Sequence, residues 1–177
     1  MADPALTGVL LVGGASTRFG SPKALAQLGG ETLAERAWRL LGEVCDERIA
    51  VGKRRDRLEL PFDVLDDGTD VRAPLAGIVA GLRSASHEVS VVIPVDMPLL
   101  TSAALRELAA ACRDVAVPQT GPLPGAYRRT ALPALEEALA GDRLALRDAI
   151  AGLHFAVVQL DASVLANVNT QYDVQRL

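Results

Sequence analysis

The sequence predicts an α/β fold in which helices cover both faces of a mostly parallel sheet. Two observations carry this prediction. Short apolar runs alternate with segments of helical period at least as far as Val117. Half of the 177 residues are hydrophobic but only 3% are aromatic, so the core is built from Leu, Val, Ala and Ile, which suits helices packed on a sheet. We expect a single domain over residues 1–177 with a three-layer, Rossmann-like architecture.

The predicted strands are six apolar runs, at residues 8–12, 48–51, 62–65, 89–95, 115–117 and 155–160. Helices are predicted between them from their start signals. A capping box from Thr32 to Glu35 opens the first helix. Pro74 suits the first turn of the second helix, and Thr101 or Ser102 caps the third.

Residues 119–127 interrupt this alternation with prolines and glycines. Two interpretations are open, an insertion beside the substrate or a plain surface loop. Tyr127 stands next to Arg128 and Arg129 and could face a large ring system, but we favour a core-anchored edge strand.

Composition excludes several classes of function. The net charge of −4 is spread over both signs, so no basic surface for nucleic acid is expected. No apolar stretch is long enough to span a membrane, and the first residues do not resemble a signal peptide. The two cysteines, Cys45 and Cys112, lie far apart without metal-ligand spacing, which favours a reduced protein of the cytoplasm.

The loop after the first strand is the strongest functional signal. Gly13 and Gly14 let the backbone approach a ligand closely and leave N–H groups that can point at an anion. Arg18 and Lys23 add two cations within the same short segment. Because ligands of open parallel sheets bind beyond the carboxyl ends of the strands, we expect this loop to bind a polyphosphate.

The two common phosphate-binding loops do not fit this segment. Five residues separate Gly14 from Gly20, and Lys23 has no adjacent hydroxyl, so the spacing is not that of a Walker A loop. Adjacent glycines also rule out the G-x-G-x-x-G fingerprint of NAD-dependent oxidoreductases.

Asp96 is a second candidate site residue, because it ends the apolar run 89–95. A carboxylate at the end of a buried strand is costly unless a cation meets it. In the common strand order the first and fourth strands are neighbours, which would bring Asp96 beside the Gly13 loop. Mg²⁺, held by Asp96 and substrate phosphates, is the expected partner; the alternative is an Asp that caps the next helix.

The pattern G-G-x-S-x-R-F-G-x-x-K from Gly13 to Lys23 resembles the signature loop of nucleotidyltransferases, and most closely that of the MobA family of molybdenum cofactor guanylyltransferases. Val12 stands for the family's Ala and Phe19 for its Met. Pro22 replaces the usual Asp before the lysine, and relatives with other substrates also carry Pro here.

Other segments extend the resemblance over nearly the whole chain. A-P-L-A-G at residues 73–77 is similar to the family's G-P-L-A-G, D-M-P begins at Asp96, and N-V-N-T-Q-Y-D at residues 167–173 is similar to N-x-N-T-P-E-D. The resemblance implies roles by position. Lys23, Arg18 and Asp96 would act in catalysis, with Asp96 as the metal ligand. The nucleotide would be bound by Leu11, Val12, Gly13, Gly14, Lys23, Lys53, Asp66, Asp67 and Asp96.

The cofactor acceptor would be contacted by Arg143, Asn167 and Asn169. Each weaker position has an ordinary alternative: Asp66 and Asp67 could form a turn before Gly68, Lys53 could belong to a solvated charge run, and the asparagines could bond their own loop.

The resemblance implies that the protein uses Mg²⁺ to transfer GMP from GTP to the terminal phosphate of molybdenum-molybdopterin, with release of pyrophosphate. Its partners would be GTP, molybdopterin and other proteins of cofactor biosynthesis or molybdoenzyme maturation, without nucleic acid or membrane. Two alternatives stay open: a related nucleotidyltransferase on the same scaffold, such as a cytidylyltransferase for molybdopterin or another small phosphorylated acceptor, and a non-catalytic nucleotide-binding protein.

Overall fold

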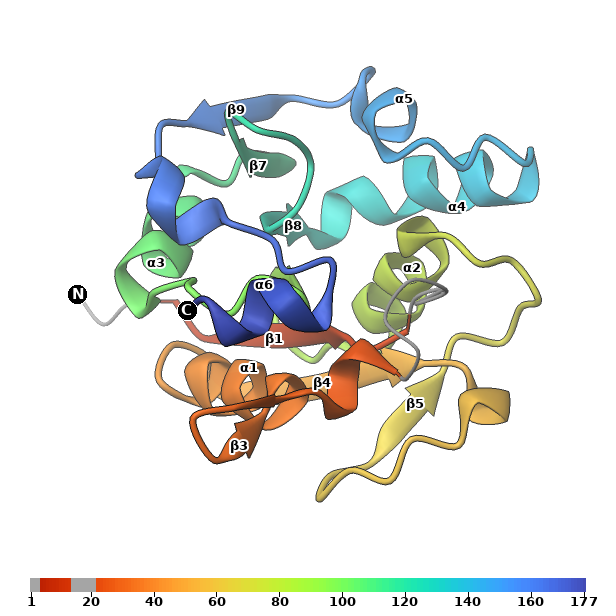
Figure 1. Ribbon diagram of the computed structural model, residues 1–177. Helices are drawn as coiled ribbons and strands as arrows, with labels where there is room; N and C mark the ends of the chain where they lie inside the picture. Colours follow the sequence, from red (N-terminus) through yellow and green to blue (C-terminus); the bar gives the residue numbers. More distant parts are fainter. Residues whose placement is uncertain (1–3, 14–21) are drawn as a thin grey trace.

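The computed structural model describes residues 4–13 and 22–177 of the chain (Figure 1). Its centre is a seven-stranded sheet in the order β5-β4-β1-β6-β8-β7-β9. All strands are parallel except β8, which is antiparallel to both of its neighbours. The strands are β1 (Leu6–Leu11), β4 (Glu47–Gly52), β5 (Val64–Asp66), β6 (Val89–Pro94), β7 (Val115–Pro118), β8 (Gly125–Arg128) and β9 (Phe155–Val158).

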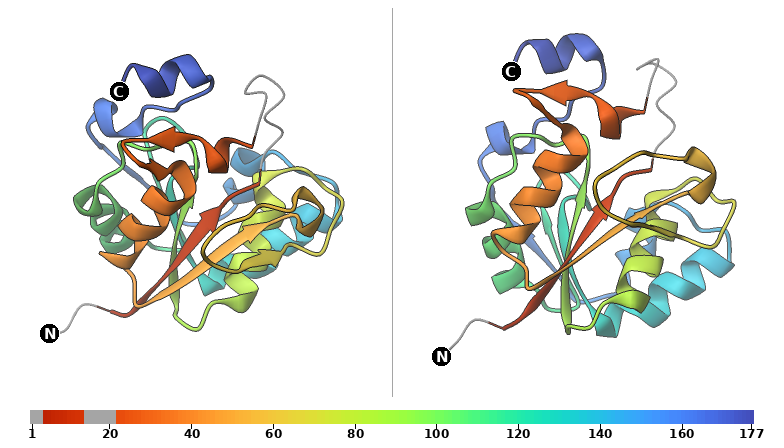
Figure 2. Two further views of the ribbon diagram at one scale, coloured as in Figure 1. Left: turned by 60° about the horizontal axis from the view of Figure 1, so that its bottom comes forward. Right: turned by 90° about the horizontal axis from the view of Figure 1, so that it is seen from below.

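Helices cover both faces of the twisted sheet, as the right-hand view of Figure 2 shows. One face carries α1 (Leu33–Gly42) and α3 (Ser102–Ala111), and the other carries α2 (Pro74–Ser84), α4 (Leu132–Ala140) and α5 (Leu146–Ile150). The start signals in the sequence are confirmed. Thr32 and Glu35 form the capping box of α1, Pro74 opens α2, and the Thr101 side chain accepts a hydrogen bond from the N–H of Ala104 at the start of α3.

The smaller elements lie between these layers and at the end of the chain. A short hairpin of β2 (Gln27–Leu28) and β3 (Glu31–Thr32) precedes α1, and α6 (Gln171–Gln175) ends the chain. In both views of Figure 2, α6 lies over the segment that contains this hairpin. The described residues also contain four 3-10 turns: η1 (Lys23–Leu25), η2 (Arg54–Asp56), η3 (Arg129–Ala131) and η4 (Ala162–Leu165).

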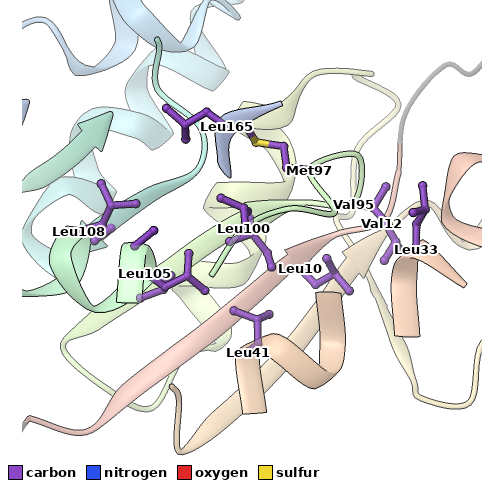
Figure 3. Packing of buried hydrophobic residues seen from close by; sticks show 14 of the residues in the cluster. Leu10, Val12, Leu33, Leu41, Val95, Met97, Leu100, Leu105, Leu108 and Leu165 are labelled. Atoms are coloured by element: carbon purple, nitrogen blue, oxygen red, sulfur yellow. The ribbon is translucent and has the colours of Figure 1, made fainter. Parts of the chain in front are cut away.

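Side chains of β1 alternate between two apolar cores, as expected for a strand buried on both faces. Leu10 packs with α1 and α3, whereas Val9 packs with α2 and α4. Figure 3 shows the first core, in which Leu10 and Val12 lie near Leu33 and Leu41. The second core is tight because α2 presents two glycines to β1: a Cβ atom at Gly77 would lie 2.8 Å from Leu11, and one at Gly81 would lie 2.6 Å from Val9.

The segment after β7 differs from its prediction. Residues 125–128 form β8 in the interior of the sheet, between β6 and β7, so Tyr127 lies on neither an edge strand nor a plain surface loop. Its side chain is fully buried, and its hydroxyl donates a hydrogen bond to the carbonyl oxygen of Pro122 at 2.6 Å. Burial raises the Tyr127 pKa well above its ordinary value. This side chain is part of the core and does not face a ligand.

Candidate functional site: the carboxyl edge of the sheet

A cavity of about 760 Å³ lies beyond the carboxyl ends of β1, β4, β5 and β6. Backbone hydrogen bonds between the strand ends hold the residues at the base of the cavity. The N–H of Val12 donates to the carbonyl oxygen of Val51 in β4, and the N–H of Val95 donates to the carbonyl oxygen of Leu11 in β1. β1 and β6 correspond to the first and fourth predicted strands, and their parallel pairing confirms that these two strands are neighbours. Leu11, Val12 and Gly13 line this cavity, whereas Gly14 and Arg18 lie outside the described residues.

Lys23 and Asp96 meet in the cavity although 73 residues separate them. Lys23 begins η1, and its Nζ lies 3.2 Å from Asp96 Oδ2. Asp96 lies two residues after the end of β6, and the hydrogen bond from the N–H of Val95 to the carbonyl oxygen of Leu11 ties this position to β1. The two side chains are 19% and 22% exposed, which leaves the pair open to a ligand in the cavity. Asp96 thus meets a cation, as the cost of a strand-end carboxylate predicts.

Asn169 reaches the same place from the end of the chain. Its side-chain oxygen accepts a hydrogen bond from Lys23 Nζ at 3.2 Å. The N–H of the preceding residue, Val168, donates to the backbone oxygen of Asp96 at 2.9 Å. The segment 167–170 therefore returns to the site, and Asn169 bonds more than its own loop. Asn167 is exposed.

Lys53 and Asp67 form a second ion pair on the far side of the cavity. Lys53 Nζ lies 2.6 Å from Asp67 Oδ1 and 2.5 Å from the carbonyl oxygen of Thr69. The side chains are 7% and 6% exposed. Burial of this depth contradicts the alternative that Lys53 belongs to a solvated charge run. Both residues line the cavity, so this wall carries a buried lysine and a carboxylate.

Asp66 has a different environment from Asp67. Its carboxylate accepts hydrogen bonds from the backbone N–H groups of Arg54 and Gly68, which lower its pKa below the ordinary value. Asp67 also accepts from the N–H of Thr69, so both aspartates form the turn that the sequence allowed. Of the two, Asp67 lines the cavity, whereas Asp66 ties this turn to η2.

Sequence reasoning missed several residues that line the cavity, among them Asp56, Arg72 and Leu123. Arg72 Nη2 lies 2.8 Å from Asp56 Oδ1, and this ion pair joins the loop before α2 to η2. Leu123 reaches the cavity from the loop before β8. Arg72 stands directly before the A-P-L-A-G segment, which was the one available signal. Nothing in the sequence connects Asp56 or Leu123 to the site, because both arrive through loop conformation.

Arg143 is not brought to the cavity. It lies in the connection between α4 and α5, where its guanidinium is 3.3 Å from Glu137 and its side chain is 59% exposed. The local sequence could not show that this residue lies away from the site. Arg143 lies between two helices and does not follow a strand, so its distance from the carboxyl edge of the sheet could not be inferred.

The described residues offer a restricted setting for a metal ion. Among residues 4–13 and 22–177, no group of three or more His, Cys, Asp or Glu side chains gathers to hold one. A divalent cation at Asp96 would therefore complete its coordination largely with water and substrate oxygens. That arrangement fits Mg²⁺, which is commonly held by one or two carboxylates and substrate phosphates. In the same part of the chain, no helix has the length and apolarity that crossing a membrane requires.

Comparison with known proteins identifies relatives across the chain. The family model of the MobA-like NTP transferase domain matches residues 8–158. The molybdenum cofactor guanylyltransferase of Desulfosudis oleivorans is 30% identical, over 97% of this chain and 94% of that protein. Molybdopterin-guanine dinucleotide biosynthesis protein A of Archaeoglobus fulgidus has the same fold, with a TM-score of 0.82 at 23% identity over 96% of this chain and 95% of the other.

The fold is shared beyond these relatives. The 2-C-methyl-D-erythritol 4-phosphate cytidylyltransferase of Thermus thermophilus aligns with a TM-score of 0.71 at 19% identity, over 95% of both chains. The fold alone therefore does not distinguish between transferases of different nucleotides.

Proposed function

The chain belongs to the MobA-like NTP transferase family, and we propose that it transfers GMP from GTP to the terminal phosphate of molybdenum-molybdopterin. The products would be pyrophosphate and the guanine dinucleotide form of the cofactor. The names of the relatives support the reaction. One structural observation carries it: Lys23 and Asp96 pair within the cavity, and Asn169, from a third distant motif, accepts a hydrogen bond from the same lysine.

The order of the strands suggests how the substrates lie. Along the carboxyl edge, Asp67 follows β5, Lys53 follows β4, Gly13 lies just beyond β1 and Asp96 follows β6. Neighbouring strands are about 4.8 Å apart, so these positions span on the order of 14 Å. We place the base near Lys53 and Asp67, the phosphates between Gly13 and Lys23, and the acceptor phosphate beside Asp96 and Asn169.

The transfer requires charge neutralisation more than proton transfer. A phosphate oxygen of the acceptor forms a bond to the α-phosphorus of GTP, while the bond from that phosphorus to the bridging oxygen of pyrophosphate breaks. The nucleophile is already an anion, so no general base is needed. The Lys23 ammonium would stabilise the charge that develops on pyrophosphate, and the backbone of Gly13 would approach the phosphates.

Mg²⁺ fits the reaction through Asp96. When bound, it would neutralise charge on the phosphate oxygens and hold them in place. Asp96 would supply its protein ligand, and the ion pair with the Lys23 ammonium would hold that carboxylate at the cavity before the substrate arrives.

Pyrophosphate release tests this proposal. The full chain would be incubated with each of the four nucleoside triphosphates, with and without molybdenum cofactor, in the presence of Mg²⁺. We expect release with GTP and cofactor together, and little with either alone. Release that depends on CTP would identify a cytidylyltransferase on the same scaffold. Binding of nucleotide without release under any condition would identify a non-catalytic nucleotide-binding protein.

A further inference from the structure

We propose that Asn169 is a positioning residue, whose neutral side-chain oxygen holds the Lys23 ammonium in the direction that the transferred phosphates require. This inference rests on the proposed function for its consequence in catalysis, but its structural half can be tested without substrate. It gives Asn169 a task that differs from direct contact with the acceptor.

The geometry at Lys23 carries the inference. Its Nζ lies 3.2 Å from Asp96 Oδ2 and 3.2 Å from Asn169 Oδ1. A lysine side chain has four rotatable bonds and loses much rotamer freedom when it is fixed. Two acceptors, on segments that approach from different elements, restrict the ammonium far more than either alone.

The segment that carries Asn169 is itself fixed to the site. The Asp173 carboxylate accepts hydrogen bonds from the N–H groups of Asn169 and Thr170, both at 2.8 Å. Thr170 completes a capping box for α6 with Asp173. Val168 is 2% exposed, and its N–H bonds the backbone of Asp96. Asn169 thus extends from a backbone that is anchored to Asp96 on one side and to α6 on the other.

The chemistry of the amide explains why an asparagine suits this task. If Asp96 bound a metal ion and Lys23 met the substrate phosphates, the direct attraction between Asp96 and Lys23 would weaken. The amide oxygen of Asn169 continues to orient the ammonium and does not neutralise it. Asn169 therefore takes none of the positive charge of Lys23 away from the leaving pyrophosphate. A carboxylate at position 169 would compete with the phosphates for the same cation.

The small number of lysines makes it possible to measure whether Asn169 holds the Lys23 ammonium. Lys23 and Lys53 are its only lysines, and both line the cavity. Protein labelled with ¹⁵N-lysine therefore gives two side-chain ammonium signals, and Lys53, buried between Asp67 and Thr69, serves as an internal reference. We expect Asn169→Ala to broaden or remove the Lys23 signal and to leave the Lys53 signal unchanged.

Conservative variants separate orientation from folding. Asn169→Asp keeps an oxygen acceptor at the same position, so the Lys23 signal should persist. Gln175→Ala removes an exposed amide from the same C-terminal segment and should change neither signal. Thermal unfolding of each variant shows that the fold is retained. A Lys23 signal that is unaffected by Asn169→Ala in the folded protein would overturn the inference.

Steady-state kinetics test the catalytic half. Loss of one hydrogen bond to a charged group should lower kcat about tenfold in Asn169→Ala, with smaller changes in KM for GTP and for the acceptor. An increase in acceptor KM alone, with an unchanged kcat, would assign Asn169 to direct acceptor binding and would contradict positioning. If the unmodified chain releases no pyrophosphate at all, the proposed function fails, while the lysine signals still decide whether Asn169 holds Lys23.

Discussion

Lys53 and Asp67 form an ion pair at 2.6 Å inside a cavity that otherwise opens to solvent. Their side chains are almost completely withdrawn from water, so each charge depends on the other. Removal of one partner from a buried pair leaves an uncompensated charge, which costs far more than the net contribution of the intact pair.

We therefore expect Lys53→Met to lower the free energy of unfolding by about 3 kcal/mol, and Asp67→Asn to have a similar effect. The double variant should be less destabilised than the sum of the single variants, because it buries no lone charge. Urea unfolding of the three proteins measures this coupling. Arg54→Met, at an exposed neighbouring position, is the control and should change stability by less than about 0.5 kcal/mol. Additive single effects would contradict a coupled pair.

Asp96→Asn should abolish turnover while the fold survives, since it removes one charge at nearly constant volume. Asp96 is the strand-end carboxylate through which Mg²⁺ would bind, so a neutral amide should also raise the Mg²⁺ requirement of any residual activity. Pyrophosphate release across a Mg²⁺ titration measures both effects. Asp148→Asn, at an exposed position in α5, should behave as the unmodified chain. Unchanged activity of Asp96→Asn at limiting Mg²⁺ would remove Asp96 from the mechanism.

Lys23→Ala should weaken the binding of GTP and ATP alike. The Lys23 ammonium lies on the side of the cavity that we assign to the phosphates, opposite the pair of Lys53 and Asp67 that we assign to the base. Every nucleoside triphosphate would present it with the same phosphates. Equilibrium binding of the two nucleotides, in the presence of Mg²⁺ and without acceptor, measures the loss for each. A loss confined to GTP would contradict this assignment and would place Lys23 near the base.

The sequence predicted the elements whose signals are local. The capping box at Thr32 and the proline that opens α2 are confirmed, because a helix start depends on a few adjacent residues. The position of Asp96 at the end of β6 also follows from the apolar run before it. β8 could not be predicted in the same way. Its pairing between β6 and β7 is non-local, and its four residues, G-A-Y-R, show no alternation of apolar and polar side chains.

The candidate site could likewise be predicted from local motifs, but its non-local contacts could not. Motifs assigned Lys23, Lys53, Asp67, Asp96 and Asn169 to it, but they did not predict which of these side chains pair with each other. These pairings depend on how the loops return to the edge of the sheet. They bring Lys53 to Asp67, and they bring Lys23 to both Asp96 and Asn169. The same limit applies to Arg143, whose sequence context resembles a site segment although its side chain faces Glu137.

Gly81→Ala should destabilise the protein by about 1–3 kcal/mol, because the added methyl group would lie 2.6 Å from Val9 of the central strand and α2 would have to move away from the sheet. Gly152→Ala is a matched control, since a Cβ atom there meets nothing within 4 Å. Denaturant midpoints of the two variants provide the measurement. Equal stability would show that the contact between α2 and β1 can relax without cost.

Stability at low pH should depend on Asp173. Hydrogen bonds from the N–H of Asn169 and from Thr170 lower the pKa of its carboxyl below the ordinary value of 3.8. A carboxylate whose pKa is lowered by folding stabilises the protein above its unfolded pKa, and this contribution is lost as the pH falls through the folded pKa. The stability difference between the unmodified chain and Asp173→Asn should therefore be constant near neutrality and shrink below about pH 4. Urea unfolding at a series of pH values measures it; a difference that grows with acidity would reverse the assignment.

The residues that line the cavity come almost entirely from the first part of the sequence. Between Leu11 and Asp96 the chain supplies every described lining residue except Leu123. Residues 97–166 then add β8, β7, β9 and three helices beyond β6, with that one side chain reaching back. Apart from Leu123, insertions or exchanged loops in this later part would leave the described lining of the cavity in place. Loop grafts between related transferases that are meant to keep the cavity are therefore best placed between residues 97 and 166.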